Sequence, residues 1–263
     1  PYLCEIMKNN IFKKTLPQVS SETTQYFREY LDHLDDLHKI IDDAYELYMP
    51  QVRQEIFDLT KLVDSKIVTE PFNILEIGTK FGGTFHIWNS LNKTGGLNIS
   101  IDMSDGGIHG GISDAEMDSR DKMFNQKFDN CRFVRGDSHD DMTLYQLINF
   151  FNPTDDFNFP QALKIPKVID FLFIDGDHSY DGVKQDFEMY VHFVKTGGII
   201  AFHDIVISDR HHERNVYVGE FWQELTKVRP TETTCLYAGD EYEFQETVHG
   251  DGTWAGIGII TKL

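Results

Sequence analysis

Cysteine is scarce in this sequence, and the cysteines that are present form no recognised pattern. Cys4, Cys131 and Cys235 lie far apart, are odd in number and include no CxxC pair. This argues against a disulfide scaffold and against a zinc site, and it favours a reducing compartment.

Long hydrophobic runs are also missing. No stretch approaches the ~18 to 20 apolar residues that a membrane-spanning helix needs. The first residues, PYLCEIMKNNIFKK, have no basic segment ahead of an apolar core, which a secretory signal would show. We therefore expect a soluble, cytoplasmic protein.

Positive charge is the third shortage. The 263 residues include 24 Lys and Arg against 43 Asp and Glu, and the formal net charge is −19. No local basic cluster offsets this charge. Nucleic acids and anionic membranes bind through such clusters, so we expect neither as a partner.

The segment from Ser20 to Ile67 has the period of amphipathic helices. Apolar residues recur at steps of three and four, and Pro50 separates two such stripes. We interpret residues 1–70 as a helical N-terminal extension, either a lid over the site or a contact in a homo-oligomer. Residues 71–263 would form the main domain.

After Pro71 the pattern changes to short apolar runs that alternate with amphipathic segments. This alternation predicts βαβ units and a doubly wound, mostly parallel α/β sheet. Near the C-terminus two β-like runs follow a helix, which predicts an antiparallel hairpin at the sheet edge. The expected strands are Asn73–Ile77, Asn98–Asp102, Cys131–Arg135, Ile169–Ile174, Gly198–His203, Thr233–Tyr237 and Thr253–Thr261, and the expected helices are Thr84–Leu91, Asp114–Gln126, Met142–Phe150, Ser179–Val194 and Val218–Val228.

Ligands of such sheets bind beyond the carboxyl ends of the strands, so the residues just after each strand are the candidates. The first strand ends LEIGTKFGGTF, where Gly78 allows a sharp turn and Gly82 and Gly83 let a ligand approach a helix start. The spacing is GxxxGG, whereas a dinucleotide-binding loop would have GxGxxG. The same glycines could also serve a tight turn alone.

Polar residues end the next two strands. Asp102 falls at the tip of the second strand, where a carboxylate can accept both hydroxyls of a ribose. Asp137 and Ser138 follow the third strand and are placed to hydrogen-bond an adenine edge. Alternatively, they cap the helix that starts near Asp140.

The fourth and fifth strands end FLFIDGDHSY and GGIIAFHDI. Asp175 and Asp204 would lie side by side, and two buried like charges repel without a cation or a proton between them. We therefore predict a functional role for both, and also for His178 between them. Asp177 is interpreted as a turn residue, and Ser179 as the N-cap of the next helix. The acids of that helix, Asp181, Asp186 and Glu188, are interpreted as solvated or first-turn charges.

Together, LEIGTKFGGT, the acid ending strand two, GDS, FIDGDHSYDGVKQDFEMY and GGIIAFHDI resemble the class I S-adenosylmethionine-dependent methyltransferases. The resemblance covers about residues 73–204 and is strongest to cephalosporin-hydroxylase-like proteins and to metal-dependent macrolide-sugar and rhamnosyl O-methyltransferases. It implies a Rossmann-like sheet of seven strands.

The resemblance also implies roles for the residues at the strand ends. Asp102 would hold the ribose of S-adenosylmethionine, and Asp137 with Ser138 its adenine. The residues of the first loop, Glu76, Gly78, Gly82 and Thr84, would hold the methionine part, and Thr79 is counted with them as cofactor-binding.

For the chemistry, the resemblance implies that Asp175 and Asp204, with His203, hold a divalent cation, and that His178 is the general base. Several metal-dependent relatives have a carboxylate where this chain has His203. Oxygen ligands favour magnesium, and an added imidazole favours manganese or another transition metal. We expect magnesium, with manganese or another metal as the alternatives.

The expected function is therefore O-methylation of a hydroxyl on a small-molecule acceptor, a sugar or a secondary metabolite. An NAD-dependent oxidoreductase is one alternative, which the GxxxGG spacing and the FHD element disfavour. A non-catalytic cofactor-binding module is another, which is favoured by the presence of His203 in place of a carboxylate. The acceptor pocket would draw on the N-terminal helices, on Ile108–Ser113 and on a loop with His211, His212 and Arg214, which could also be an ordinary polar loop.

Overall fold

The structure is a computed structural model, which divides into two compact units, residues 1–39 and 40–263. It describes residues 21–68, 71–104, 111–151 and 167–263. The loop predicted at Asn152–Pro166 and the first half of Ile108–Ser113 therefore lie outside the described residues. In the first unit the described residues belong to α2 (Ser21–Tyr45), and this helix ends in the second unit.

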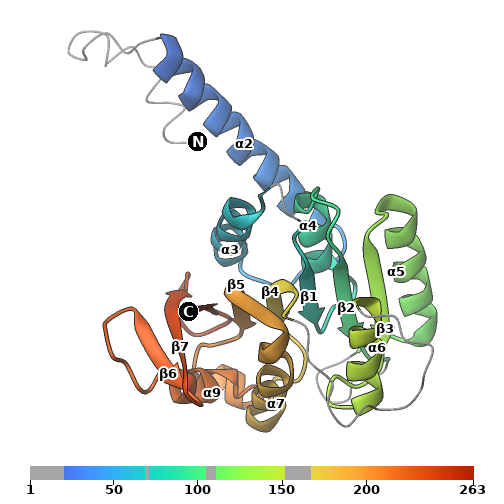
Figure 1. Cartoon of the computed structure of the whole chain (residues 1–263), viewed down its shortest axis with the longest axis vertical. Helices are drawn as coiled ribbons and strands as arrows, with labels where there is room; N and C mark the ends of the chain where they lie inside the picture. The colour runs from blue at the N-terminus through green and yellow to red at the C-terminus, as the bar shows by residue number, and fades with distance from the viewer. Residues whose placement is uncertain (1–20, 69–70, 105–110, 152–166) are drawn as a thin grey trace. The chain divides into compact units, whose positions relative to one another are not determined.

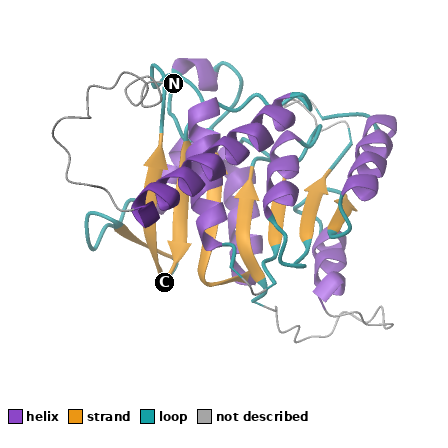
Figure 2. Ribbon diagram, turned by 90° about the horizontal axis from the view of Figure 1, so that it is seen from above, coloured by secondary structure: helices purple, strands orange, loops and turns teal. Residues whose placement is uncertain are grey.

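One eight-stranded sheet organises the second unit (Figure 2). Its strand order is β3-β2-β1-β4-β5-β8-β7-β6, so the order reverses between β1 and β4. The first five strands are parallel, and β8 and β7 continue the sheet antiparallel. The strands are β1 (Ile74–Ile77), β2 (Asn98–Asp102), β3 (Cys131–Arg135), β4 (Ile169–Ile174), β5 (Val194–His203), β6 (Thr234–Tyr237), β7 (Asp240–Thr247) and β8 (Ile257–Lys262).

The mostly parallel Rossmann-like sheet and its antiparallel C-terminal end are confirmed, but the predicted count of seven strands is wrong. The missed strand is β7, with the sequence DEYEFQET. Only Tyr242 is fully buried in it, and most of its other side chains are exposed and charged. Such a strand pairs through its backbone and carries too few apolar residues to be noticed in the sequence.

The fifth strand also begins earlier than predicted, at Val194 rather than Gly198. The helix before it ends at Tyr190 and is followed by a 3-10 turn, Val191–Phe193. The pairing of β4 with β5 changes register between Ile169 and Phe171. This irregularity accommodates the residues around Gly197, which has a φ of +81°. Gly197 also interrupts the apolar pattern of the strand in the sequence.

Helices cover both faces of the sheet (Figure 1). One layer contains α6 (Asp141–Phe151), α7 (Tyr180–Tyr190) and α9 (Val218–Leu225), and the other contains α3 (Arg53–Lys66), α4 (Gly83–Leu91) and α5 (Asp114–Lys127). A short helix, α8 (Asp209–His212), follows β5. In the described ranges, no helix has the length and apolar character needed to cross a membrane.

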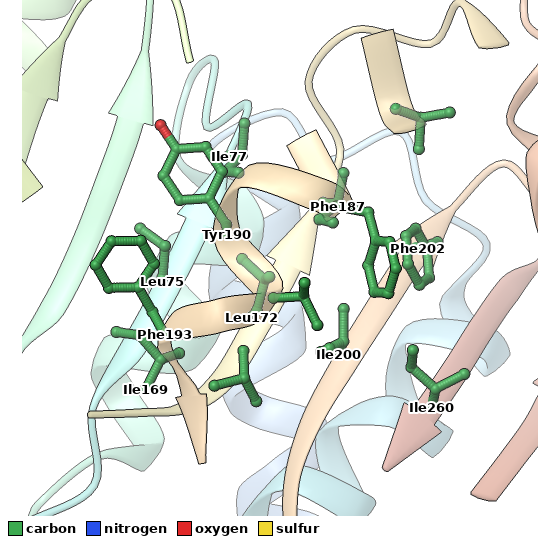
Figure 3. Close-up of a cluster of buried hydrophobic side chains, with 14 of the residues drawn as sticks. Leu75, Ile77, Ile169, Leu172, Phe187, Tyr190, Phe193, Ile200, Phe202 and Ile260 are labelled. Carbon is green, nitrogen blue, oxygen red and sulfur yellow. The ribbon is translucent and has the colours of Figure 1, made fainter. Parts of the chain in front are cut away.

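The buried strands are apolar on both faces, as expected for a parallel sheet under two helical layers. Leu172 of β4 faces the core cluster beneath α7, together with Phe187 and Phe202 (Figure 3). On the opposite face, Phe171 packs edge-on against Trp88 of α4 at 4.9 Å between ring centroids. The core therefore holds the carboxyl ends of β1, β4 and β5 at one edge.

Gly78 allows β1 and β4 to approach at that edge. A Cβ at this position would lie 2.1 Å from the Asp175 carbonyl oxygen, and the φ of Gly78 is +86°. We predict that Gly78→Ala lowers the free energy of unfolding by at least about 3 kcal/mol, because left-handed backbone and overlap both cost energy.

Gly95→Ala is the matched control for denaturant unfolding. Gly95 has a φ of +82° and no atom within 4 Å of its added Cβ, so only the backbone cost of about 1 to 2 kcal/mol should appear. Equal losses in the two variants would contradict the account of the strand approach.

Candidate active site

The loop after β1 surrounds a buried carboxylate. Glu76 is fully buried, and the Trp88 indole Nε1 donates to its Oε2 at 2.6 Å. Burial raises the pKa of Glu76 to about 8, against hydrogen bonds from Thr79, Trp88 and Thr84. Thr79 in turn accepts from the Ser100 hydroxyl at 2.7 Å. Three of the predicted cofactor-binding residues are thus joined in one polar cluster.

The glycines of this loop make room for the start of α4. Gly82 is its N-cap with a φ of +91°, and a Cβ there would meet the Phe124 ring at 2.6 Å. A Cβ on Gly83 would meet the Met49 side chain at the same distance. Both glycines are therefore required by the packing of the loop against Phe124 and Met49, which places the N-terminus of α4 directly after the loop.

Asp102 ends β2 with its carboxylate directed at the same loop. Its Oδ2 accepts from the Lys80 backbone N–H at 2.7 Å and from Arg120 at 2.6 Å, and its Oδ1 accepts from the Met103 N–H at 3.0 Å. Arg120 is buried and also donates to the Lys80 carbonyl at 2.7 Å. Arg120, which the sequence did not single out, thus orients the predicted ribose acceptor.

Asp137 and Ser138 form a turn after β3. The Asp137 Oδ1 accepts from the His139 N–H at 2.9 Å, and its side chain is 55% exposed. The cap of the following helix is instead Asp140, whose Oδ1 accepts from Met142 N–H at 2.8 Å. The capping alternative for Asp137 and Ser138 therefore does not account for them.

The tips of β4 and β5 bring four predicted residues together. Ile174 pairs with Phe202, so Asp175 follows beside His203. The four residues are Asp175, His178, His203 and Asp204. His203 Nδ1 lies 3.1 Å from Asp175 Oδ1 and 3.3 Å from Asp204 Oδ1. His178 contacts the same two acids, with Nδ1 3.1 Å from Asp204 Oδ2 and Nε2 3.8 Å from Asp175 Oδ1.

Burial and charge oppose each other in this cluster. Burial disfavours the charged imidazoles, but Asp204 and Asp175 outweigh it, so the pKa of His178 is raised and that of His203 is raised strongly. Burial likewise disfavours the Asp204 carboxylate, yet His203 and His178 hold its pKa well below the usual range. The two imidazoles thus lower the repulsion between the two adjacent carboxylates.

Asp204 has a backbone conformation that side chains rarely adopt. Its φ is +64°, in the left-handed region. Its Oδ1 is buried without a hydrogen-bond partner among the residues described. Such a conformation costs of order 1 to 3 kcal/mol and is concentrated at functional sites.

Two residues that the sequence did not predict also reach this cluster. Gln51, which precedes α3, donates from Nε2 to Asp175 Oδ2 at 2.9 Å. His211 of α8 is buried, with Nδ1 2.5 Å from the Val206 carbonyl and Nε2 3.5 Å from Asp204 Oδ1. The neighbouring His212 instead contacts Glu220 at 2.6 Å, at the surface.

The turn residues of the DGDHSY element are as predicted, with one exception further along α7. Asp177 Oδ1 accepts from the Ser179 N–H at 2.8 Å, and the Ser179 hydroxyl accepts from the Gly182 N–H at 3.0 Å and caps α7. The prediction that Asp186 is a solvated charge is wrong, because its side chain is fully buried. A single sequence does not show that the second turn of this helix faces a polar loop.

As the side chains stand in the described part of the chain, no group of three or more His, Cys, Asp or Glu has the geometry of a metal site. The chemistry of the donors is nevertheless suitable, because two carboxylates and an imidazole are common ligands of divalent ions. Asp204 Oδ1 makes no well-aligned hydrogen bond among the residues described, so it retains a lone pair for a ligand.

The sequence of the sheet region matches a known family. Residues 75–205, about half of the chain, match the family described as "Methyltransferase domain". The chain belongs to the class I S-adenosylmethionine-dependent methyltransferases. The match runs from β1 to the residue after Asp204, so it contains every residue predicted to bind the cofactor, hold the cation or act as the base of this methyltransferase.

Solved structures share the fold of the methyltransferase. A Staphylococcus aureus protein provisionally named a caffeoyl-CoA O-methyltransferase is 18% identical with a TM-score of 0.54, over 91% of this chain and 98% of that one. The O-methyltransferase TomG of Streptomyces achromogenes, involved in tomaymycin synthesis and solved with S-adenosylmethionine, is 16% identical with a TM-score of 0.51, over 86% and 88%.

A curated relative is the uncharacterized protein y4gI of Sinorhizobium fredii. It is 27% identical over 164 residues, which are 61% of this chain. The methyltransferase spans only about a sixth of that relative's length, since the matched part is 16% of it.

The buried Glu76 makes stability depend on pH. Folding raises its pKa from 4.5 to about 8, so between these values the folded chain holds a proton that the unfolded chain has released. The wild type should therefore lose up to about 1.4 kcal/mol of unfolding free energy per pH unit as the pH rises through this window. We predict that Glu76→Gln lacks this component.

Urea unfolding of both proteins at pH 5, 6, 7 and 8 measures the effect. The difference in unfolding free energy, Glu76→Gln minus wild type, should grow with pH. A difference that does not change with pH would show that folding leaves the Glu76 carboxyl unperturbed.

Proposed function

We propose that this methyltransferase transfers the methyl group of S-adenosylmethionine to a hydroxyl of a small acceptor, with a divalent cation at the tips of β4 and β5. The observation that carries the proposal is the convergence of Asp175, His178, His203 and Asp204 beside the glycine loop of β1. The fold shared with TomG, an O-methyltransferase, supports it.

On the cofactor side, the proposal assigns Asp102 to the ribose and the Glu76–Thr84 loop to the methionine part. S-adenosylmethionine supplies a methyl group on a sulfonium. Three donors already hold the Asp102 carboxylate in place, which leaves about one of its four lone-pair positions for a ligand. A carboxylate held in this way can bind a ribose hydroxyl without reorganising.

On the acceptor side, the proposal makes His178 the general base. Methyl transfer is an in-line displacement in which the acceptor oxygen bonds to the methyl carbon, the carbon–sulfur bond breaks, and the hydroxyl proton must leave. His178 Nδ1 lies 3.1 Å from Asp204 Oδ2, and this contact orients the ring. In the neutral ring, Nε2, which at 3.8 Å is beyond hydrogen-bond distance of Asp175 Oδ1, would accept the proton. A base held in this way contributes about 10² to 10⁴ in rate.

The cation would be held by Asp175, Asp204 and His203. Bound there, a divalent ion would orient the acceptor hydroxyl and lower its pKa. Two carboxylates suit magnesium, and the imidazole suits manganese. As for the acceptor, the resemblance to sugar O-methyltransferases favours a sugar or a glycosylated metabolite, and the excess of acidic residues disfavours a polyanion.

Thermal unfolding with ligands tests the proposal. Ligands that bind only the native state at a hundredfold excess over Kd add about 2.7 kcal/mol, which is about 5 to 10 °C in Tm for a unit of this size. We expect such a shift with S-adenosylmethionine and with S-adenosylhomocysteine, a further shift with Mn²⁺ or Mg²⁺, and none with NAD.

Two outcomes would contradict the proposal. A shift with NAD alone would favour the oxidoreductase and remove the methyl donor. If the shift with S-adenosylmethionine is the same in Mn²⁺, in Mg²⁺ and in EDTA, the cation has no part in the site.

A further inference from the structure

One face of α7 is directed at the loop that follows β3. Gly182, Asp186 and Tyr190 are spaced by four residues and therefore share this face. His139 Nε2 lies 3.1 Å from Asp186 Oδ1 and 3.2 Å from the Gly182 carbonyl oxygen. The Tyr190 hydroxyl donates to the Ser138 carbonyl at 2.7 Å. In Figure 3 this hydroxyl points away from the apolar side chains around the ring.

Asp186 is an unfavourable residue for the stability of a helix whose only role is to cover a sheet. Its side chain is fully buried, and neither oxygen makes a well-aligned hydrogen bond to the residues described. Burial raises the pKa of Asp186, against contacts with His139 and with the Ser138 side chain, and the contact with Asp186 raises the pKa of His139. Burying a carboxylate destabilises the fold, whereas an apolar side chain of similar size would stabilise the helix layer. The contacts with His139 and with the Ser138 side chain are what an apolar residue could not supply.

The loop held by α7 is next to the proposed ribose site. The Gly136 N–H donates to the Asp102 carbonyl at 2.9 Å, and Asp102 pairs with Arg135 in the sheet. A base attached to a ribose at Asp102 would extend outward, toward Asp137 and Ser138. Asp137 is exposed, and its Oδ1 is oriented by the His139 N–H at 2.9 Å.

We propose that Asp186 is a positioning residue for base recognition, acting through His139 to fix the Asp137–Ser138 turn that reads the cofactor's adenine. The inference rests on the proposed function, because it takes a nucleoside at Asp102. A fixed carboxylate at Asp137 accepts a hydrogen bond from the 6-amino group of adenine and repels a carbonyl oxygen at the same position. Asp186 and His139, by fixing the Asp137 carboxylate, therefore control which base the site accepts.

The test compares S-adenosylhomocysteine with S-inosylhomocysteine, which carries an oxygen in place of the 6-amino group, by calorimetric titration. The wild type should bind the adenine compound at least about tenfold more tightly, because the mismatched site leaves polar groups unpaired. In Asp186→Asn this ratio should fall toward one. His139→Gln should act in the same direction, and because His139 is less buried than Asp186 this variant is available if Asp186→Asn does not fold.

Asp181→Asn is the matched control, since Asp181 lies on the same helix and is exposed. It should keep the wild-type ratio. A folded Asp186→Asn or His139→Gln protein with an unchanged ratio would overturn the inference, as would equal weakening of both ligands or a wild type that binds both alike. If the wild type does not bind S-adenosylhomocysteine at all, the proposed function fails instead.

Discussion

The structure depends most on how two adjacent carboxylates are held at the tips of β4 and β5. Parallel pairing puts Asp175 beside His203, and the left-handed backbone of Asp204 turns its carboxylate back toward the same imidazole. His203 Nδ1 lies within 3.3 Å of both acids. Without this positive charge, or a cation in its place, the two strand ends would repel each other.

Much of the surrounding structure supports that arrangement. Gly78 lets β1 approach the Asp175 backbone, and Gln51 holds the outer oxygen of Asp175 from a segment far away in sequence. On the other side, Arg120 and the Lys80 N–H fix Asp102. The acids that would meet the two ends of the methyl donor are therefore positioned before any ligand binds, which is a requirement for fast transfer.

The sequence predicted the parts of the fold that rest on local pattern. β1 to β4 and the helices between them are apolar runs and amphipathic segments separated by glycine or polar turns, and their bounds agree with the structure to within a few residues. β7 was missed because backbone pairing with β8 and β6 defines it, and its side chains are mostly charged. The boundary at residue 70 between extension and main domain stays a prediction.

The positions of candidate site residues were predictable where a polar side chain ends or directly follows a strand, as for Asp102, Asp175 and Asp204. They were not predictable where a side chain arrives from elsewhere. Gln51 is 124 residues from Asp175, and His211 reaches Asp204 because α8 packs against the residues that precede β8, where the Ala255 N–H donates to His211 Nε2. Asp186 looked like a surface charge because its partner, His139, belongs to another loop. The spacing of apolar residues in the sequence does not predict such contacts, since they depend on how the loops pack.

The most direct test of the central claim is to measure both methyl transfer and cofactor binding in His178→Gln. Transfer of labelled methyl from S-adenosylmethionine to a panel of sugar and phenolic hydroxyls gives the first quantity, and titration with S-adenosylhomocysteine gives the second. The account predicts a loss of about 10² to 10⁴ in turnover with the dissociation constant changed less than about threefold, and no loss in the exposed control His192→Gln. Full turnover in His178→Gln would contradict it.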